Sequence, residues 1–418
     1  MPSGRLEATA PSIQRSHSAD RRADLDFMRA FVVAGLVIFH SAVVFALGTS
    51  WFVNDPQPSV GFTVFLLWGS LWGMPLLFLV SGMGVRYATR TRSAGAFVRE
   101  RLARLFVPFV VGLVLLVPPM FYLGRLGQPG FHESYWRFWL RFLDIPAMSV
   151  GILTHGSWSE FDPAHMWFLY VLLLFSITLL PLFLYLQSPR GARLVDRAAG
   201  FTERRGIVVL FGGAIPMAAV EAAFGPDVNT GGWERVVYLF PLLYGYVIAS
   251  DPRFETAIRR SRRMALAGAL VVTAVLVAWA TALGDAVDIR DGGVPALSAL
   301  QGLAGWLWIV SILGFAGSII ARRSTRSPTN ADEPPAKPES RWRRAARYAN
   351  EAVLPFYVLH EPVIVVAAWV IVRWDGPIVG KYLALVIVSF AVTLGLYEVL
   401  VRRFRVTRVL FGMKPAGG

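Results

Sequence analysis

Hydrophobic residues in this chain are gathered into long runs that short polar or basic segments separate. A helix needs roughly 20 apolar residues to cross the hydrocarbon core of a bilayer. Ten runs approach this length, and the fifth and sixth are short and contain Pro216 and Pro241. The pattern predicts an all-α polytopic membrane protein with about ten transmembrane helices, over residues 27–48, 62–85, 105–123, 166–187, 207–224, 235–250, 264–283, 296–320, 353–372 and 380–401.

Basic residues alternate sharply between successive connections. The N-terminal segment with Arg29 and the connections around 86–104, 188–206, 251–263, 321–352 and 402–418 together hold 34 of the 41 Lys and Arg residues. Cytoplasmic loops of membrane proteins carry such an excess of Lys and Arg. We therefore predict that both termini are cytoplasmic and that the number of spans is even.

Composition excludes several other classes of protein. Only 16% of the 418 residues are charged and 55% are hydrophobic, which is too apolar for a soluble domain. The chain has no cysteine, so it has no disulfide, no thiolate nucleophile and no Cys-ligated metal. The net charge of +14 lies in alternate loops, so it indicates topology and argues against a nucleic-acid partner.

The polar segments predict the division of the chain. Residues 1–26 lack the apolar core and cleavage site of a signal peptide, so we expect a cytoplasmic tail. Residues 27–401 would form one transmembrane domain and 402–418 a second cytoplasmic tail. Within the domain, 321–352 begins with RRSTRSPTNADEPPAKPES, which is typical of a linker, and continues as the basic stretch RWRRAARYA at the inner leaflet. The outer connection 124–165 is rich in aromatic residues.

The first span carries the most informative polar residues, Asp26, Arg29 and His40. Ionisable groups inside a span are costly and are candidates for function by default. Arg29 and His40 are eleven residues apart, so on a helix both project from one face, roughly 16 Å apart along the axis. This spacing suits a long ligand lying along the helix. The alternative is that Arg29 reaches lipid headgroups and His40 bonds a neighbouring helix.

A second candidate set precedes the third span. Arg101 and Arg104 lie three residues apart at its cytoplasmic entry, so a helix places them on one face. Guanidinium pairs suit phosphate or pyrophosphate. The commoner reason for arginines at this place is the ordinary basic flank of a span.

Two further sets lie in later spans. His165 opens the fourth span from outside, followed by Trp167, and its alternative role is in an interfacial aromatic belt. His360 and Glu361 lie near the cytoplasmic end of the ninth span. Because adjacent residues point to different helix faces, we do not expect them to form a simple pair. No metal-ligand spacing, Gly-rich phosphate loop or nucleophile elbow occurs, so we predict no metal site.

Five motifs in order resemble those of the acyltransferase 3 family of membrane O-acyltransferases. They are LD-x-x-R-x10-H in the first span, SG after the second, R-x-x-R-L-x-x-P into the third, H-x-WFL at the fourth and LPFYVLHEPV in the ninth. The ending LYEVLVRRFRVTRVLFGMKP resembles the glucans biosynthesis protein C type. The resemblance spans nearly the whole chain and matches the ten-span layout.

The resemblance implies an enzyme of the bacterial inner membrane. Family members transfer an acyl group, such as acetyl or succinyl, from cytoplasmic acyl-coenzyme A to a hydroxyl of an extracytoplasmic glycan, here a periplasmic glucan. By position, Arg29 and His40 match the family's Arg-x10-His pair, Arg101 and Arg104 its Arg-x-x-Arg pair, and His165 and His360 its later histidines. Asp26, Trp167 and Glu361 would support this site. Acyl-coenzyme A would be a cosubstrate, and glycan-synthesis proteins would be partners.

His40 has two chemical roles open to it. As a neutral imidazole it could act as general base on the glycan hydroxyl, or as nucleophile through a transient acyl-imidazole. Aromatic residues between 131 and 158 could stack on sugar rings.

Two other classes of function share some of these features. A multi-span transporter or flippase of a glycan or lipid-linked precursor would also carry intramembrane arginine and histidine. Against it, the sequence has no visible inverted repeat and no acidic proton-relay chain. A structural partner of a glycan synthase is a third class. Thioester cleavage in the presence of acceptor would favour the enzyme, and glycan translocation without cleavage would favour a carrier.

Overall fold

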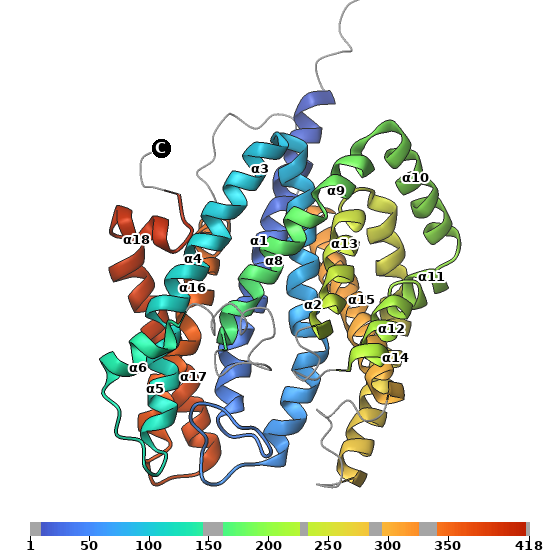
Figure 1. The fold of residues 1–418 in the computed structure, drawn as a ribbon. Coiled ribbons are helices and arrows are strands. Elements are labelled where there is room, and N and C mark those ends of the chain that lie inside the picture. Colours follow the sequence, from blue (N-terminus) through green and yellow to red (C-terminus); the bar gives the residue numbers. More distant parts are fainter. Residues whose placement is uncertain (1–9, 145–161, 226–232, 284–294, 326–340, 415–418) are drawn as a thin grey trace, which may run out of the picture.

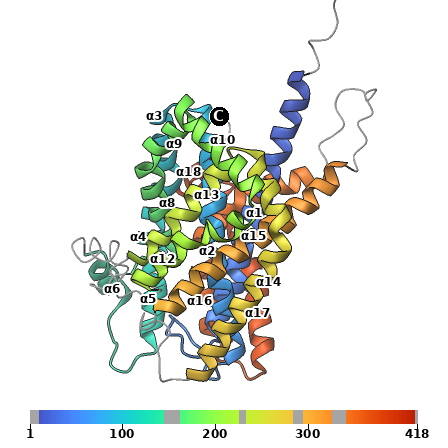
Figure 2. The same cartoon turned by 90° about the vertical axis from the view of Figure 1, so that its right-hand side faces the viewer.

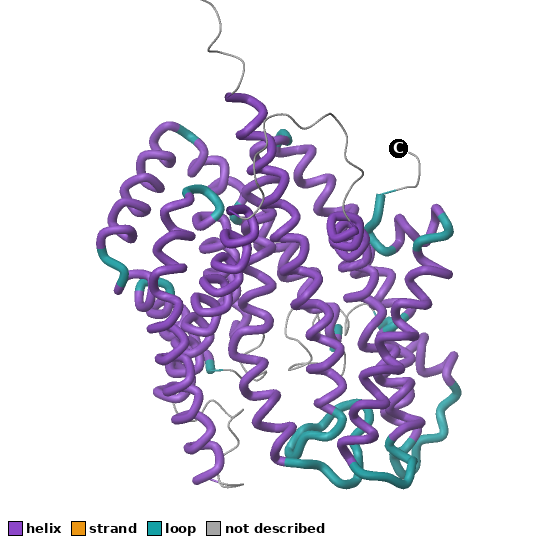
Figure 3. Tube along the Cα trace, turned by 180° about the vertical axis from the view of Figure 1, so that it is seen from behind, coloured by secondary structure: helices purple, strands orange, loops and turns teal. Residues whose placement is uncertain are grey.

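The computed structural model describes residues 10–144, 162–225, 233–283, 295–325 and 341–414, and these contain helices and turns but no strand (Figure 3). The α-helices are α1 (Ala10–Val43), α2 (Val60–Thr91), α3 (Ala94–Arg101), α4 (Val107–Leu115), α5 (Val117–Leu126), α6 (Tyr135–Phe142), α8 (Trp167–Thr178), α9 (Leu180–Gln187), α10 (Pro189–Arg204), α11 (Ile207–Phe211), α12 (Ala214–Phe224), α13 (Leu239–Ile248), α14 (Pro252–Leu283), α15 (Pro295–Thr325), α16 (Arg341–Ile371), α17 (Ile378–Leu396) and α18 (Arg405–Leu410). Short 3-10 turns precede α8 (Ala164–Met166) and α13 (Trp233–Tyr238), and π-helical turns follow α3 (Leu102–Phe106) and α17 (Tyr397–Val401).

The helices coincide with the apolar runs. Among the described residues, seven helical segments are long and apolar enough to cross a membrane, or eight if the segments Ala164–Thr178 and Leu180–Gln187, bent by 48°, form one span. Two shorter apolar helices, Phe27–Val43 and Arg235–Ile248, lie on the first and sixth predicted runs. An all-α polytopic membrane protein is therefore confirmed, whereas the count of ten crossings stays a prediction.

Local sequence explains where several helices begin. The hydroxyls of Ser59, Ser93 and Ser188 accept hydrogen bonds from amides of the first turns of α2, α3 and α10. Such caps satisfy amides that have no partner within the helix. Pro216 and Pro241, in the two least regular runs, each lie in the first turn of a helix, α12 and α13. Proline is tolerated there because those amides lack an intrahelical acceptor.

The bundle is held partly by close helix crossings. α1 packs against α2 and α16, α2 against α13, and α15 against α12 and α14 (Figures 1 and 2). At the α2–α13 crossing, a Cβ on Gly82 would overlap the carbonyl of Leu242, and one on Gly245 would overlap that of Leu79. Small residues let membrane helices approach this closely. The glycine of the SG motif is therefore explained by packing.

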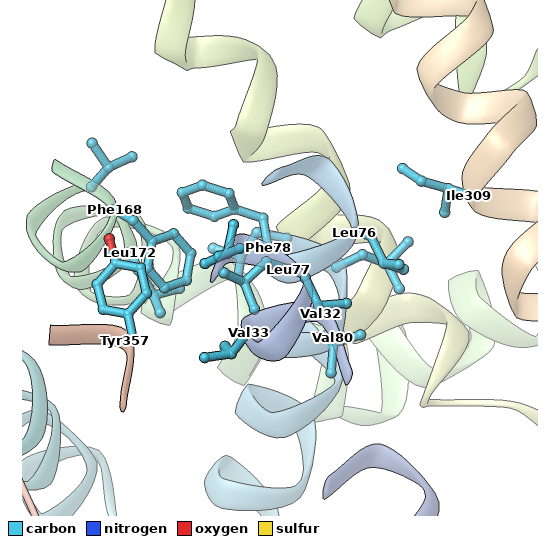
Figure 4. Close-up of a cluster of buried hydrophobic side chains, with 14 of the residues drawn as sticks. Val32, Val33, Leu76, Leu77, Phe78, Val80, Phe168, Leu172, Ile309 and Tyr357 are labelled. Atoms are coloured by element: carbon cyan, nitrogen blue, oxygen red, sulfur yellow. The ribbon is translucent and has the colours of Figure 1, made fainter. Parts of the chain in front are cut away.

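Aromatic and aliphatic side chains fill the centre of the bundle. The largest buried cluster joins α1, α2, α8, α13, α15 and α16. Figure 4 shows Phe78 of α2, Phe168 of α8 and Tyr357 of α16 within this cluster. The ring centroids of Phe78 and Phe168 lie 4.9 Å apart, and those of Phe168 and Tyr357 lie 5.4 Å apart. This packing fixes the part of α16 around Tyr357, which directly precedes polar residues of that helix, inside the bundle.

The connections gather at two ends of the bundle. α3, α10 and the C-terminal end lie at one end in Figure 1, and residues 44–59 form a loop at the opposite end. This separation agrees with the alternation of basic connections, although which end faces the cytoplasm stays a prediction. α1 begins at Ala10, inside the predicted tail, and extends past the bundle (Figure 2). α16 begins at Arg341, inside the predicted linker, of which 326–340 lie outside the described residues.

Candidate active site

Four ionisable side chains from three parts of the chain meet inside the bundle. His40 comes from the end of α1, His165 from the turn before α8, and His360 and Glu361 from the middle of α16. His40 Nδ1 lies 3.2 Å from Glu361 Oε2 and 3.1 Å from His360 Nε2. His165 Nδ1 lies 3.4 Å from the same oxygen of Glu361. We call these four residues the histidine cluster.

Backbone carbonyls fix the orientation of two of the imidazoles. Nε2 of His165 lies 3.1 Å from the carbonyl oxygen of Val358, and Nδ1 of His360 contacts that of Tyr357. A carbonyl only accepts hydrogen bonds, so each of these nitrogens carries a proton. In a neutral His360 ring, the lone pair is then on Nε2.

These assignments determine the state of His40. Its Nδ1 faces the carboxylate of Glu361 and the lone pair of His360, so Nδ1 must be the protonated nitrogen. The lone pair of neutral His40 is then on Nε2, which has no hydrogen-bond partner among the described residues. This is the arrangement of a base oriented by a neighbouring carboxylate.

His40 opens onto a cavity of about 780 Å³, which we call the central cavity. The His40 side chain is 20% exposed, whereas His165, His360 and Glu361 are buried. Most of the lining is aromatic or apolar, including Phe31, Trp51, Phe52, Trp68, Trp72, Trp167 and Tyr238. A reacting group in this cavity would be shielded from bulk water beside His40, the most exposed member of the histidine cluster, which suits acyl transfer.

A constrained turn presents His165. Ala164 has a φ of +49°, which is unusual for a residue with a side chain, and its amide donates to Asp162 Oδ1 at 2.7 Å. Burial raises the pKa of Asp162 to about 6, although the Ala164 amide and Arg235 lower it. The Tyr357 hydroxyl donates a hydrogen bond to the His165 carbonyl. Asp162 also lines the central cavity, and no sequence motif indicated it.

The predicted arginines line a separate cavity of about 520 Å³, the inner cavity. Arg29, Arg101 and Arg104 all contribute to its wall. Nη2 of Arg29 donates to the Val80 carbonyl at 3.3 Å. A Cβ on Gly84 would overlap this guanidinium, so a larger residue there would displace the end of the Arg29 side chain.

Arg101 and Arg104 differ in their surroundings. The Arg101 guanidinium lies 4.9 Å from the Phe97 ring centre, and its buried Nε has no hydrogen-bond partner within the described chain. A buried donor without an acceptor is unfavourable, so a ligand oxygen or a water bound there would satisfy it. Arg104 is half exposed and lies 3.6 Å from Glu100, which also pairs with Arg92 at 2.6 Å. Glu100 therefore neutralises part of this basic group.

Tyr357 connects the two cavities. Its side chain lines both the inner and the central cavity, and it bonds His165 through its hydroxyl and His360 through its carbonyl. The arginines and the histidine cluster thus lie on two sides of one buried tyrosine. The sequence motif LPFYVLHEPV contains Tyr357, but its role was not predicted.

A family model described as an acyltransferase domain, of the acyltransferase 3 type, matches residues 22–398. The chain belongs to the acyltransferase 3 family. It is therefore a multi-pass membrane acyltransferase, as the five motifs predicted. No curated protein and no solved structure gives a significant match. The finer resemblance to the glucans biosynthesis protein C type stays a prediction.

The structure of this acyltransferase revises two interpretations of its sequence. His360 and Glu361 were expected near the cytoplasmic end of their span and not as a simple pair, yet both reach His40, which lies three residues before the end of α1. The two side chains point to different faces of α16, as expected. They join one cluster because His40 contacts both of them and His165 contacts Glu361. His165 is buried in the cluster, so the interfacial belt is wrong for it. Trp167 lines the central cavity beneath the Arg235 guanidinium.

Some predicted residues have no place in the site. The Asp26 side chain and residues 145–161 lie outside the described part of the chain. The described aromatics of the outer connection pack on one another, with Phe138 and Phe142 against Tyr122 and Phe121. Phe138 and Phe142 therefore pack within α6 and against α5, whereas Trp136 is exposed.

The histidine cluster also has the composition of a metal site. Ligand atoms of His40, His360 and Glu361 lie within 4.8 Å of one another. Imidazole and carboxylate ligands suit zinc, and histidine ligands of zinc commonly donate their other nitrogen to a carbonyl, as His360 does. A metal there would occupy the same atoms that orient His40, so base and metal ligand are exclusive roles for these groups.

Proposed function

We propose that this acyltransferase moves an acyl group, acetyl or succinyl, from cytoplasmic acyl-coenzyme A to a hydroxyl of an extracytoplasmic glycan such as a periplasmic glucan. The observation that carries the proposal is the meeting of two cavities at Tyr357. One cavity is lined by arginines and the other by an imidazole with a free nitrogen. A donor with phosphates at one end and a thioester at the other needs both.

The inner cavity would bind the phosphates of the donor. Arg101 offers a buried guanidinium with an unpaired Nε, and Arg29 and Arg104 add two more positive charges. Charge-assisted hydrogen bonds to phosphate are among the strongest in proteins. Held there, coenzyme A would extend its pantetheine arm past Tyr357 toward His40, roughly 16 Å from Arg29 along α1.

His40 would activate the acceptor in the central cavity. Its Nε2 takes the hydroxyl proton while the hydroxyl oxygen attacks the thioester carbonyl. Collapse of the tetrahedral intermediate breaks the carbon–sulfur bond, and the thiolate leaves with the proton returned by His40. Glu361 stabilises the imidazolium through Nδ1. Direct attack by Nε2 on the thioester, followed by transfer from an acyl-imidazole, uses the same atoms.

The remaining members of the cluster would orient this pair. His165 and His360 are buried, and the carbonyls of Val358 and Tyr357 hold their rings. Both are positioning residues in this scheme: His360 does not line the central cavity and contacts His40 Nδ1, and His165 lines it but turns its Nδ1 to the Glu361 carboxylate. The proposal places the protein in the inner membrane of a bacterium, with the acceptor outside.

The test compares matched variants in detergent with acetyl- and succinyl-coenzyme A. His40→Ala should reduce kcat by about 10²- to 10⁴-fold, the usual contribution of a general base. The control is His132→Ala, at an exposed site away from the cluster. Arg101→Ala should raise the KM for the donor by about 10- to 150-fold, since a lost charged contact costs about 1.5–3 kcal/mol. Arg99→Ala, at an exposed residue that does not line this cavity, should not.

Two results would refute the scheme. Wild-type turnover by a folded His40→Ala protein would exclude His40 as base and as nucleophile. An Arg101→Ala defect of equal size with a phosphate-free pantetheine thioester would show that this arginine does not bind phosphate.

A further inference from the structure

A third cavity, of about 570 Å³, lies on the side of the bundle where the loops are poor in basic residues, and we call it the outer cavity. Its walls are the loop after α1, the end of α5 and the turn between α16 and α17. No motif in the sequence indicated it. The lining is about as polar as it is apolar, unlike the central cavity, and includes Gln57, Trp369, Arg373, Trp374 and Asp375.

These side chains have the chemistry that recognises a sugar. Trp374 is 49% exposed, so its ring can cover the C–H face of a pyranose. Gln57, Arg373 and Asp375 supply planar donors and acceptors suited to neighbouring hydroxyls. The Arg373 guanidinium stacks 3.7 Å from the Trp369 ring centre, which holds its donors in place.

A buried ion pair fixes the cavity wall. Lys381 Nζ lies 2.9 Å from Asp55 Oδ2, with only 8% and 3% of the two residues exposed. Lys381 Nζ also donates to the Val372 carbonyl at 3.2 Å, and Asp55 Oδ1 accepts a hydrogen bond from the backbone amide of Gln57 at 3.0 Å. The loop after α1 is thereby tied to both α16 and α17. Because these contacts already hold the wall in place, ligand binding would cost little further conformational entropy.

The outer cavity adjoins the central cavity. Phe52 and Gly124 line both, and a Cβ on Gly124 would lie 3.1 Å from the Phe52 carbonyl oxygen. The rings of Phe52 and Trp51 lie 5.4 Å apart in a tilted arrangement, and the Trp51 ring lies 6.5 Å from that of His40. The two cavities therefore lie next to each other and share wall residues, so neighbouring sugars of one oligosaccharide would each have a space.

We propose that the outer cavity is a second acceptor subsite, which binds the sugar next to the one that is acylated. The acceptor is then an oligosaccharide or polysaccharide, read at two positions. This inference rests on the proposed function, because it assumes that the hydroxyl attacks from the central cavity at His40. An apolar occupant is disfavoured by Arg373, Asp375 and Gln57.

The experiment uses the full-length protein in detergent, acetyl-coenzyme A, and glucose, a glucose disaccharide and a glucose tetrasaccharide as acceptors. In the wild type, KM should fall by roughly tenfold from glucose to the tetrasaccharide, the scale of one aromatic stacking contact with its burial. Trp374→Ala should remove this gain and leave kcat, the donor KM and the glucose KM unchanged. Trp136→Ala, at an exposed tryptophan of α6, is the control and should keep the gain.

A binding measurement separates failure of this inference from failure of the proposed function. Calorimetric titration of tetrasaccharide into His40→Ala protein involves no turnover, and Trp374→Ala added to that variant should weaken affinity by roughly tenfold. Equal affinity with and without Trp374, or equal KM for glucose and tetrasaccharide, would overturn the subsite. Absence of transfer to any acceptor, with Trp374-dependent binding intact, would overturn the proposed reaction instead.

Discussion

Glu361→Gln tests the part of the histidine cluster that the sequence did not predict. The carboxylate lies 3.2 Å from His40 Nδ1 and 3.4 Å from His165 Nδ1, and it is buried. Glutamine keeps the volume and one acceptor oxygen but removes the negative charge. The imidazolium that forms on His40 during transfer then loses its counter-charge, whereas the neutral ground state loses much less.

The size of the effect follows from this one contact. A hydrogen bond to a charged group contributes about 1.5–3 kcal/mol, and each 1.36 kcal/mol corresponds to a factor of ten. We therefore expect kcat to fall by about 10- to 150-fold. The KM for acyl-coenzyme A should stay constant, because the arginines that bind its phosphates line a different cavity.

The assay is thiol release from acyl-coenzyme A in the presence of acceptor, followed over a range of donor concentrations. Glu398→Gln is the matched control, since Glu398 loses the same charge from an exposed pair with Arg402 at 3.0 Å. It should leave kcat unaltered. A Glu361→Gln enzyme with wild-type kcat would refute the orienting role. A defect only in the donor KM would show that Glu361 contributes to donor binding instead.

Three further predictions concern packing, ionisation and sidedness. Gly245→Ala should destabilise the fold by about 1–3 kcal/mol, because the added methyl overlaps the Leu79 carbonyl, and thermal unfolding in detergent should show it. The folded protein keeps the proton of Asp162 up to pH about 6, whereas an ordinary Asp releases it near 3.8, so stability should fall as pH rises from about 4 to about 6. Unfolding of Asp162→Asn across this range should show a shallower fall. A cysteine at Ser134 should react with an impermeant maleimide on intact cells, and one at Glu203 only after permeabilisation.

Controls for these predictions come from the same chain. Gly73→Ala, in α2 with open space around the added methyl, should not lower stability. Identical pH profiles for wild type and Asp162→Asn would show that this carboxyl does not hold its proton in the fold. The native chain has no cysteine, so labelling has no background. Labelling of both cysteines from the same side would contradict the predicted topology.

The sequence alone determined the membrane architecture and the family. Runs of apolar residues must become helices in a bilayer, because no other backbone structure in a single segment satisfies its own hydrogen bonds there. The spacing of Arg29 and His40 on one helix and the grouping of Arg101 with Arg104 depend only on local geometry, which a sequence contains. The structure places Arg101 and Arg104 in the wall of one cavity, as their spacing predicts, and helix packing adds Arg29 to it.

Only the tertiary structure decided what surrounds His40. Glu361 lies 321 positions further along the chain, and it reaches His40 because α16 packs against α1. No local periodicity encodes that crossing. The depth of His165 depends likewise on a constrained turn at Ala164 and on Tyr357 of another helix. The Asp55–Lys381 pair joins a loop to a helix far along the chain. Contacts between distant segments are set by how whole helices pack, so the sequence named the reactive residues and the fold decided which of them act together.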